Sequence, residues 1–104
     1  MSKFENVELV KAANVYFGGQ VTSRTVTFNS GEVKTLGIMM PGEYEFGTAK
    51  AEIMEIMAGE LELQQPNSTE WETIIAPTSF NVIANAKFKV KVKTLTDYCC
   101  SYID

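Results

Sequence analysis

The stretch that decides the fold runs from residue 39 to residue 63 and reads MMPGEYEFGTAKAEIMEIMAGELEL. It contains three short apolar or alternating runs, Tyr44 to Phe46, Glu52 to Met57 and Leu61 to Leu63. Pro41-Gly42 and Ala58-Gly59 mark turns, because proline presets the backbone angle φ and glycine accepts positive φ values. Alternation with a period of two predicts β-strands whose side chains point to opposite faces in turn. The stretch therefore predicts consecutive strands joined by turns.

Similar runs precede and follow this stretch. They predict strands at Val21 to Phe28, Val33 to Met39, Trp71 to Ile75, Phe80 to Ile83, Phe88 to Val92 and Tyr98 to Ile103. Only Lys3 to Asn14 carries a brief helix-like spacing, which predicts at most one short helix. Many short strands separated by turns favour two packed sheets or a small barrel. With 104 residues and no internal linker we expect one domain over residues 1–104, with residues 1–13 as an N-terminal extension or first strand.

Composition excludes several classes of function. No run of about 18 apolar residues is long enough to span a bilayer, so no membrane partner is expected. The formal net charge of −4 argues against a nucleic-acid partner, because phosphate backbones are bound chiefly by clustered Lys and Arg. Residues 1–10 do not have the pattern of a secretory signal, and adjacent Cys99 and Cys100 favour reduced thiols over a strained disulfide. These features predict a cytoplasmic protein.

The central stretch resembles the metal-binding motif of the cupins without its histidines. Cupins usually hold a metal with an H-x-H pair, a glutamate three or four residues later and a glycine seven residues beyond it. Glu52 and Gly59 keep this spacing, whereas the histidine positions fall on Phe46, Thr48 and, later, near Phe88. The chain has no histidine, and transition-metal sites depend on imidazole or thiolate ligands. The resemblance implies an all-β, RmlC-like jelly-roll barrel, here expected to hold no metal and no cofactor.

Because no metal is expected, Glu52 is the central candidate for a functional residue. An inward carboxylate in an apolar barrel must be hydrogen-bonded, hydrated or raised in pKa, and each condition suits it to binding sugar hydroxyls or to proton transfer. A structural role near the barrel mouth is the alternative. Alternation also points Tyr44 and Thr48 inward as candidate catalytic residues. Candidates for lining the substrate pocket or attracting an anion are Phe46, Phe88, Tyr98, Tyr102, Arg24 and Lys34.

Two strands have notable outer faces. Ile53 and Met57 lie on the face of their strand opposite to Glu52, and an apolar outer face predicts contact with a second sheet or a second subunit, hence a homodimer. The four lysines at positions 87, 89, 91 and 93 alternate with apolar residues. They predict a cationic outer face that is either simply solvated or attractive to anions.

Six motifs occur in order along the chain: Asn14 to Val21, Thr35 to Met39, Pro41 to Thr48, Glu52 to Ile56 with Gly59, Ser79 to Val82, and Tyr98 to Tyr102. Together they resemble the pyrimidine/purine nucleoside phosphorylase family of small bacterial cupins. The resemblance covers about Asn14 to Tyr102, and the chain differs from the usual family pattern at Gln20, Ile83 and Ser101.

The resemblance implies a pentosyltransferase that uses inorganic phosphate to cleave purine and pyrimidine nucleosides into free base and ribose 1-phosphate, without a cofactor. From residue chemistry we hypothesise that Glu52 contacts ribose hydroxyls and that Tyr44 and Thr48 frame the sugar or the phosphate. Arg24 or Lys34 would supply positive charge. The alternatives are a non-catalytic, metal-free cupin that binds a nucleoside or sugar-like ligand, and an interaction protein that acts through an exposed sheet face.

Overall fold

The computed structural model describes residues 2–103, and strands dominate their regular structure. The strands are β1 (Val7–Leu9), β2 (Asn14–Tyr16), β3 (Val21–Phe28), β4 (Val33–Met39), β5 (Gly42–Thr48), β6 (Ala51–Ala58), β7 (Glu60–Gln64), β8 (Glu72–Ile75), β9 (Thr78–Val82), β10 (Ala86–Val92) and β11 (Thr96–Ile103). One short 3-10 turn, η1 (Phe17–Gly19), follows β2. The predicted all-β class is confirmed.

The helix predicted within Lys3 to Asn14 is wrong. That segment contains β1, in which Val7 pairs with Phe28 and Leu9 pairs with Val26 of β3. A segment of this length is too short to form a stable isolated helix, whereas pairing with β3 gives its backbone N–H and C=O groups hydrogen-bond partners.

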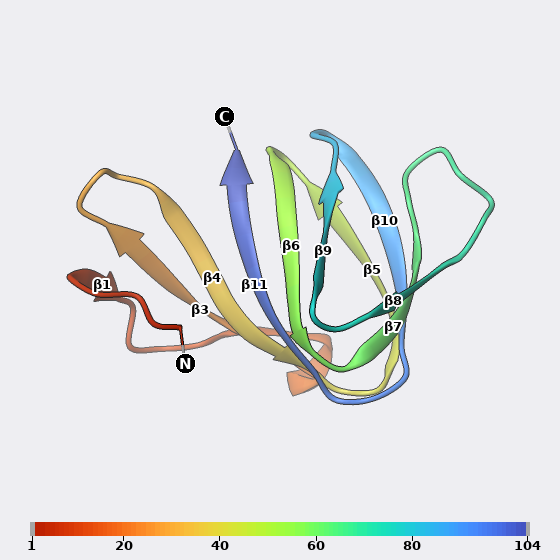
Figure 1. The fold of residues 1–104 in the computed structure, drawn as a ribbon, viewed down its shortest axis with the longest axis horizontal. Helices are drawn as coiled ribbons and strands as arrows, with labels where there is room; N and C mark the ends of the chain where they lie inside the picture. The colour runs from red at the N-terminus through yellow and green to blue at the C-terminus, as the bar shows by residue number, and fades with distance from the viewer. Residues whose placement is uncertain (1, 104) are drawn as a thin grey trace.

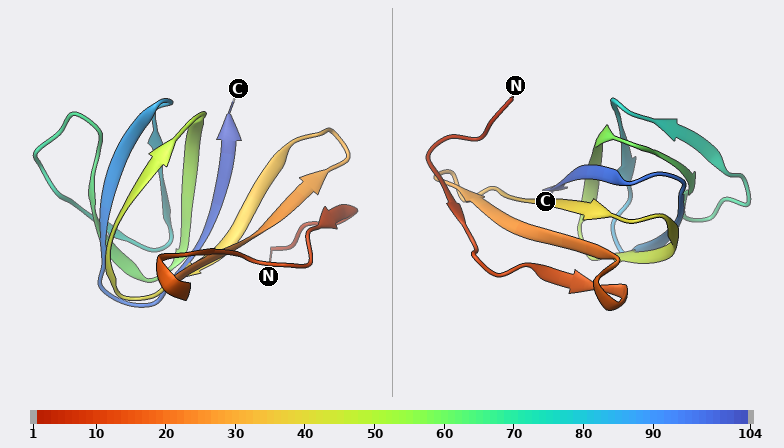
Figure 2. Two further views of the ribbon diagram at one scale, coloured as in Figure 1. Left: turned by 180° about the vertical axis from the view of Figure 1, so that it is seen from behind. Right: turned by 90° about the horizontal axis from the view of Figure 1, so that it is seen from below.

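The strands form two antiparallel sheets. The large sheet has seven strands in the order β1-β3-β4-β11-β6-β9, with β2 also pairing with β3, and the small sheet has the order β5-β10-β7-β8. In Figure 1 the strands β5, β10 and β7 lie opposite β11, β6 and β9, while β3 and β4 lean away from the barrel. The two further views in Figure 2 show the same splayed edge. The result is the jelly-roll barrel that the sequence predicted, open along one side.

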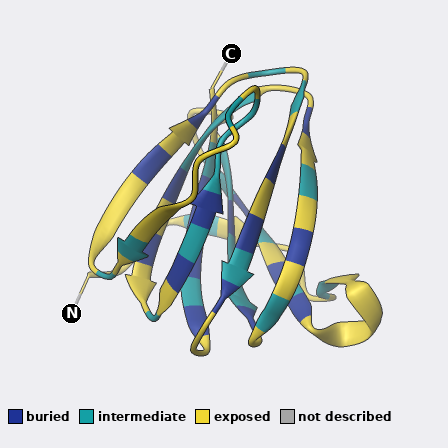
Figure 3. Cartoon of the chain, turned by 90° about the vertical axis from the view of Figure 1, so that its right-hand side faces the viewer, coloured by how far each residue is buried: buried dark blue, intermediate teal, exposed yellow. Residues whose placement is uncertain are grey.

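The core lies between the two sheets and follows the predicted alternation. On β10, Phe88, Val90 and Val92 are buried, whereas Lys87 and Lys89 are exposed. On β6, Met54 and Ile56 are buried on the same face as Glu52. Figure 3 shows this alternation of buried and exposed positions along the strands. The core is completed by residues from both sheets, including Val21, Met39, Tyr44, Leu61, Leu63, Phe80, Val82, Tyr98 and Cys100.

Register across the large sheet gathers polar side chains on its inner face. Tyr102 of β11 is paired with Glu52 of β6, and Cys100 is paired with Thr35 of β4. The register between β11 and β6 shifts between Asp97 and Tyr98, so that Met57 has no partner residue on β11. Because side chains alternate, Tyr98, Cys100 and Tyr102 all face the small sheet or the space beside it.

Gly37 makes room for Tyr98. The two residues are paired between β4 and β11, and a Cβ atom added at Gly37 would lie 2.8 Å from both the Cζ and the hydroxyl oxygen of Tyr98. The same Cβ would also collide with the carbonyl oxygen of Thr22. The Tyr98 hydroxyl donates a hydrogen bond to that carbonyl at 3.3 Å. A side chain at position 37 would therefore displace the tyrosine ring or the neighbouring strand.

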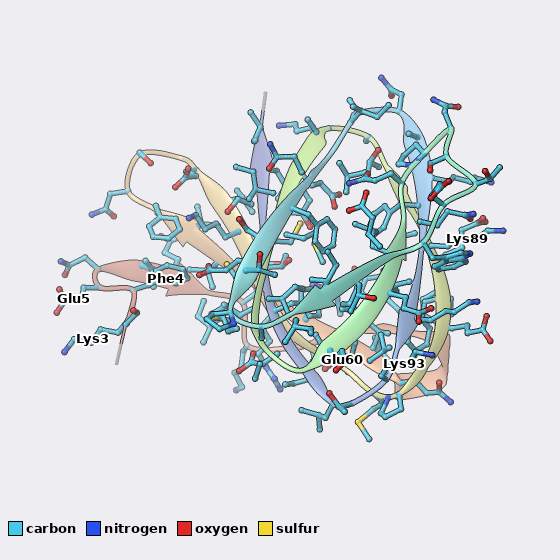
Figure 4. The ribbon with its side chains drawn as sticks, turned by 45° about the vertical axis from the view of Figure 1, so that its right-hand side comes forward. Lys3, Phe4, Glu5, Glu60, Lys89 and Lys93 are labelled. Carbon is cyan, nitrogen blue, oxygen red and sulfur yellow. The ribbon has the colours of Figure 1, made fainter. Side chains whose placement is uncertain are left out.

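The outer face of the small sheet carries balanced charge. Lys89 is paired with Glu45, Lys91 is paired with Glu43, and the Lys93 ammonium lies 3.9 Å from a carboxylate oxygen of Glu62. Figure 4 shows Lys89 and Lys93 among the side chains on this outer side. Because each of these lysines has a polar or acidic cross-strand neighbour, the arrangement favours the solvated interpretation over an anion-binding surface. Among residues 2–103 there is no helix long and apolar enough to cross a membrane.

Candidate functional site

A cavity of about 150 Å³ lies between the sheets and is open to solvent on one side. Strands β2, β3, β4, β6 and β11 of the large sheet and β5 and β10 of the small sheet contribute to it. Its lining residues are Tyr16, Ser23, Thr35, Met39, Phe46, Gly47, Glu52, Met54, Phe88, Tyr98, Cys100 and Tyr102. Tyr16 and Tyr102 are 47% and 37% exposed, so they mark the mouth.

The cavity has two chemically different sides. We call its polar side chains from the large sheet the polar wall, which consists of Tyr16, Ser23, Thr35, Glu52, Tyr98, Cys100 and Tyr102. We call Phe46 of β5 and Phe88 of β10 the aromatic wall. Their ring centroids are 5.5 Å apart with an interplanar angle of 33°, which is favourable ring packing. A planar ligand can therefore meet aromatic surface on one side and hydrogen-bonding groups on the other.

Glu52 is the carboxyl group of the polar wall. Its burial raises its pKa, while a side-chain hydrogen bond from Cys100 acts in the opposite direction. Burial raises the pKa because the charged form loses hydration, and a donor to the carboxylate partly restores its stability. Glu52 is thus half-buried and held by a neighbouring donor, as the sequence analysis required of an inward carboxylate.

Three further titratable groups of the polar wall, Tyr98, Cys100 and Tyr102, are neutral at neutral pH. Burial, followed by the charge of Glu52, raises the pKa of the Cys100 thiol to about 12. Burial raises the pKa of Tyr102 to about 12 and raises that of Tyr98 still further. These residues therefore offer S–H and O–H donors and not anions to a ligand.

The structure brings five of the nine candidate residues together. Glu52, Phe46, Phe88, Tyr98 and Tyr102 all line the cavity. They come from four strands, two in each sheet. The pocket expected around Glu52 is therefore present in the structure.

Tyr44 and Thr48 are buried as expected but lie outside the residues that line the cavity. The Tyr44 hydroxyl donates to the Met40 carbonyl at 2.7 Å and lies 3.0 Å from the side-chain oxygen of Gln20. The Thr48 hydroxyl donates to the Ile83 carbonyl at 2.7 Å and accepts from the backbone N–H of Ala86 at 3.1 Å. Both hydroxyls are engaged in holding loops against the barrel.

The two candidate cations are also placed away from the cavity. The Arg24 Nε donates to the carbonyl of Lys11 at 3.4 Å on an exposed surface. The Lys34 ammonium lies 5.6 Å from the ring centroid of Phe4 and 5.7 Å from that of Phe28. None of the described residues that line the cavity is Lys or Arg.

Sequence reasoning missed four residues of the polar wall: Tyr16 as a mouth residue, Ser23, Thr35 and Cys100. The signal for Cys100 was present, because a residue between two inward tyrosines at alternate positions must share their face. The signal for Ser23 and Thr35 was not, since their position depends on how β3 and β4 pair with β11. A register of this kind cannot be read from one strand alone.

The residues at the cupin ligand positions do not fit a transition metal. Phe46 and Phe88 pack ring against ring, and the Thr48 hydroxyl is engaged with backbone atoms. The Cys100 thiol is protonated at neutral pH, so it offers no thiolate beside Glu52. Among the described residues there is no group of three or more His, Cys, Asp or Glu that could hold a metal ion.

Comparison with solved structures defines the class of protein. An RmlC-like cupin from Shewanella frigidimarina superposes with a TM-score of 0.69 at 16% identity, covering 97% of this chain and 86% of that chain, which shows the shared fold. A protein of unknown function from Acinetobacter sp. ADP1 matches with a TM-score of 0.93 and 40% identity over 97% of this chain and 98% of that chain. The fold is that of a cupin.

Sequence comparison then defines the family. A pyrimidine/purine nucleoside phosphorylase of Sulfurimonas denitrificans is 64% identical over 99% of both chains, and one of Hydrogenovibrio crunogenus is 61% identical over the full length of both. The sequence profile of the family "Pyrimidine/purine nucleoside phosphorylase" matches residues 11–102. The chain belongs to the pyrimidine/purine nucleoside phosphorylase family, which confirms the resemblance drawn from its motifs.

Proposed function

We propose that this chain catalyses phosphorolysis of purine and pyrimidine nucleosides to the free base and ribose 1-phosphate. The observation that carries the proposal is the cavity itself, in which a carboxylate and several hydroxyls line one side and two neighbouring phenylalanine rings line the other. Membership of the family supports the reaction class. The two walls supply what a nucleoside needs: aromatic surface for a planar base and polar groups for a sugar.

In this proposal the base lies against the aromatic wall and the ribose against the polar wall. Cleavage of the glycosidic bond builds positive charge on the sugar and negative charge on the leaving base, while phosphate attacks the anomeric carbon. The carboxylate of Glu52 accepts hydrogen bonds from ribose hydroxyls and stabilises the developing positive charge. Holding the phosphate and the nucleoside in one orientation contributes further to the rate.

Neutral donors are the groups available to the phosphate inside the cavity, since its described lining contains no Lys or Arg. Ser23 and Thr35 lie on adjacent strands of the polar wall and present hydroxyl groups, whereas the Tyr98 hydroxyl already donates to the Thr22 carbonyl. In this proposal Arg24 and Lys34 do not contact the substrates and contribute only long-range electrostatic attraction. Tyr44 and Thr48 act as positioning residues, through the loops that their hydroxyls hold.

The test is to incubate the purified protein with a panel of nucleosides, with and without phosphate and with a chelator present, and to follow free base by chromatography. Phosphate-dependent release of base supports the proposal. Binding of a nucleoside without release would favour the metal-free binding module instead, and absence of both would favour an interaction protein. The chelator arm tests whether the activity needs a divalent metal.

We also propose that the protein is a homodimer. Five large apolar side chains near the N-terminal edge of the large sheet, Leu9, Val10, Val15, Tyr16 and Phe17, are 47–62% exposed. A run of this kind is typical of a surface that a second copy covers. Analytical ultracentrifugation should show a dimer for the wild type and a monomer for Val15→Lys. Ile75→Lys, at an equally exposed position on β8, should remain dimeric.

We further propose that the chain functions as a single domain and is located in the cytoplasm. Two free and buried cysteine thiols support a reducing compartment. Fractionation of cells that express the untagged protein should recover it with cytoplasmic markers, and recovery with an exported fraction would contradict this.

A further inference from the structure

The inner face of β3 carries hydroxyl groups at alternate positions. Ser23 and Thr25 lie two residues apart on this strand, so their side chains point to the same face. Ser23 is only 4% exposed and lines the cavity, whereas Thr25 is half-buried and does not line it. A buried hydroxyl group needs hydrogen-bond partners, and these partners decide whether it offers a donor or an acceptor to a ligand.

Asn14 of β2 is a hydrogen-bond partner of both hydroxyl groups. It is the register partner of Ser23, so the two side chains lie on the same face of the sheet. The side-chain nitrogen Nδ2 of Asn14 donates to Ser23 Oγ at 3.2 Å and to Thr25 Oγ1 at 3.3 Å. An amide group has two N–H donors, so each hydroxyl oxygen accepts one of them. Asn14 is half-buried and does not line the cavity itself.

The bond from Asn14 fixes the direction of the Ser23 hydroxyl. Because the Ser23 oxygen accepts from the β2 side, its own hydrogen is directed away from the Asn14 amide. On the other side Ser23 is paired with Gly37 of β4, and Tyr98 packs over this glycine and lines the cavity. Ser23 also opposes the rise that burial causes in the pKa of Tyr98, which is the effect of a hydrogen directed toward the phenol oxygen. Ser23 therefore presents a donor to the cavity.

A hydroxyl group that is held as a donor suits an anion. Inorganic phosphate is anionic near neutral pH, and its oxygens act chiefly as hydrogen-bond acceptors. The described lining of the cavity contains no Lys or Arg, so a phosphate in it depends on neutral donors. A hydroxyl group that can rotate freely presents its lone pairs as readily as its hydrogen, and a lone pair repels the anion.

We propose that Asn14 is a positioning residue for phosphate, because it holds the Ser23 hydroxyl as a donor to a phosphate oxygen. The inference rests on the proposed function for the role of phosphate as a substrate. When phosphate binds, the Ser23 hydrogen turns from the Tyr98 oxygen to a phosphate oxygen, which is the stronger acceptor because it is charged. The bond from Asn14 to Ser23 Oγ stays in place throughout.

The first measurement is independent of catalysis. Inorganic phosphate is titrated at constant ionic strength into isotope-labelled protein, and the backbone amide signal of Ser23 and the side-chain NH2 signals of Asn14 are followed by NMR. Both should shift in the wild type, and the midpoint gives the Kd. Ser23→Ala should weaken binding about tenfold, as expected for the loss of a hydrogen bond to a charged group. Asn14→Ala should weaken it about threefold, because the hydroxyl group remains but loses its fixed direction.

Asn14→Asp tests the direction of the bond. A carboxylate at this position can only accept, so it turns the Ser23 hydrogen away from the cavity and should weaken phosphate binding more than Asn14→Ala does. Asn67→Asp is the control for the added charge, since Asn67 is exposed in the segment between β7 and β8. It should bind phosphate as the wild type does. Wild-type affinity in Asn14→Asp would mean that this side chain accepts from Ser23, and it would overturn the inference.

A double-mutant cycle separates positioning from a general loosening of β2. In a Ser23→Ala background, Asn14→Ala should cause no further loss of phosphate affinity, because the group that it positions is already gone. In a Thr25→Val background it should still cause the threefold loss. Thr25→Val alone is the matched control, since it removes the other acceptor of the same amide, and it should bind as the wild type does. An equal effect of Asn14→Ala in both backgrounds would overturn the inference.

The second measurement is the rate of base release as a function of each substrate. The KM for phosphate should rise in Asn14→Ala and in Ser23→Ala, while the KM for the nucleoside stays at the wild-type value. Base release whose KM for phosphate does not respond to either substitution would overturn the inference and leave the proposed function in place.

The opposite result would separate the two proposals in the other direction. Phosphate binding that depends on Asn14 and Ser23, in a protein that releases no base, would overturn the proposed function and leave the inference in place. Wild-type NMR signals that do not respond to phosphate would overturn the inference.

Discussion

The two walls of the cavity differ in how they are built. The aromatic wall consists of Phe46 and Phe88, which lie side by side as register partners on β5 and β10 of the small sheet. Phe88 belongs to the apolar core, and Phe46 packs against it. The polar wall is assembled from five strands of the large sheet, where β3 and β4 lean away from the barrel. Apolar packing fixes the first wall, and strand register fixes the second. Substitutions in the two walls should therefore fail in different ways.

The largest expected effect is on the polar wall. Glu52→Gln should lower kcat/KM for phosphorolysis by about a hundredfold, because the amide keeps the shape but removes the charge that stabilises the sugar in the transition state. The measurement is the rate of free base release, with circular dichroism to confirm the fold. Glu55→Gln, on the outer face of the same strand, should retain wild-type activity. Full activity in a folded Glu52→Gln would remove the carboxylate from the mechanism.

The next largest effect is a loss of stability when a side chain fills the space that Gly37 leaves for Tyr98 of the polar wall. Gly37→Ala places a Cβ 2.8 Å from the Tyr98 hydroxyl oxygen and against the Thr22 carbonyl, so the strands must shift. Overpacking of this kind costs about 1–3 kcal/mol, and each kcal/mol lowers the Tm by roughly 4–8 °C in a domain near this size.

Gly47→Ala is the control for this substitution, since its Cβ would lie 3.9 Å from the nearest atom, the Ala86 carbonyl oxygen. Differential scanning calorimetry should show a clear loss of Tm for Gly37→Ala and little change for Gly47→Ala. Equal Tm values for the two variants would show that the Tyr98 site can relax at no cost.

A smaller effect is expected from the aromatic wall. Phe46→Leu keeps an apolar side chain but loses the flat ring surface, so the KM for nucleosides should rise roughly tenfold, as expected for the loss of one stacking contact. The KM for phosphate should not change. Phe80→Leu is the control, because Phe80 packs 6.4 Å from Phe88 but does not line the cavity. An equal rise in the KM values for nucleoside and for phosphate would contradict the proposal that the aromatic wall binds only the base.

The smallest effect is the pH dependence of stability. Because burial raises the pKa of Glu52 in the folded protein, its contribution to stability is fully present below the pKa of the unfolded chain and is lost as pH rises through the folded value. Glu52→Gln lacks this loss. The variant should therefore gain Tm relative to the wild type between acidic and neutral pH, by a few degrees, in thermal scans over that range. A constant difference across the range would contradict the raised pKa.

Much of the fold could be predicted from the sequence, because strand alternation is local. Phe88, Val90 and Val92 reveal the inner face of β10 without knowledge of its neighbours, and Glu52 does the same for β6. The short segment around Val7 was misread, since its pairing with Phe28 depends on a distant strand. Three residues alone, without a partner, carry too little periodicity to separate a strand from a helix.

The candidate site could be predicted only in part, for the same reason. Phe46, Glu52, Tyr98 and Tyr102 were accessible through spacing and alternation, and all of them line the cavity. The placement of Arg24 and Lys34 depends on which face of β3 and β4 turns outward. The charge pattern of a single sequence does not contain that information. Arg24, the only arginine of the chain, was therefore a candidate for the cavity, but it does not line it.

The register shift at Asp97 and Tyr98 has a consequence for how this protein tolerates insertions and deletions. Met57 is the unpaired extra residue on β6, and strand pairing is regular beyond it. Deleting Met57 would leave Ile56 opposite Tyr98 and Ala58 opposite Asp97 in an uninterrupted ladder, so Glu52 would keep its partner Tyr102 and its inward face. Deleting a residue between Glu52 and Ile56 would instead leave the extra residue in place and shift Glu52 by one position. A shift of one position exchanges the two faces of a strand, so this deletion would turn the carboxyl group outward.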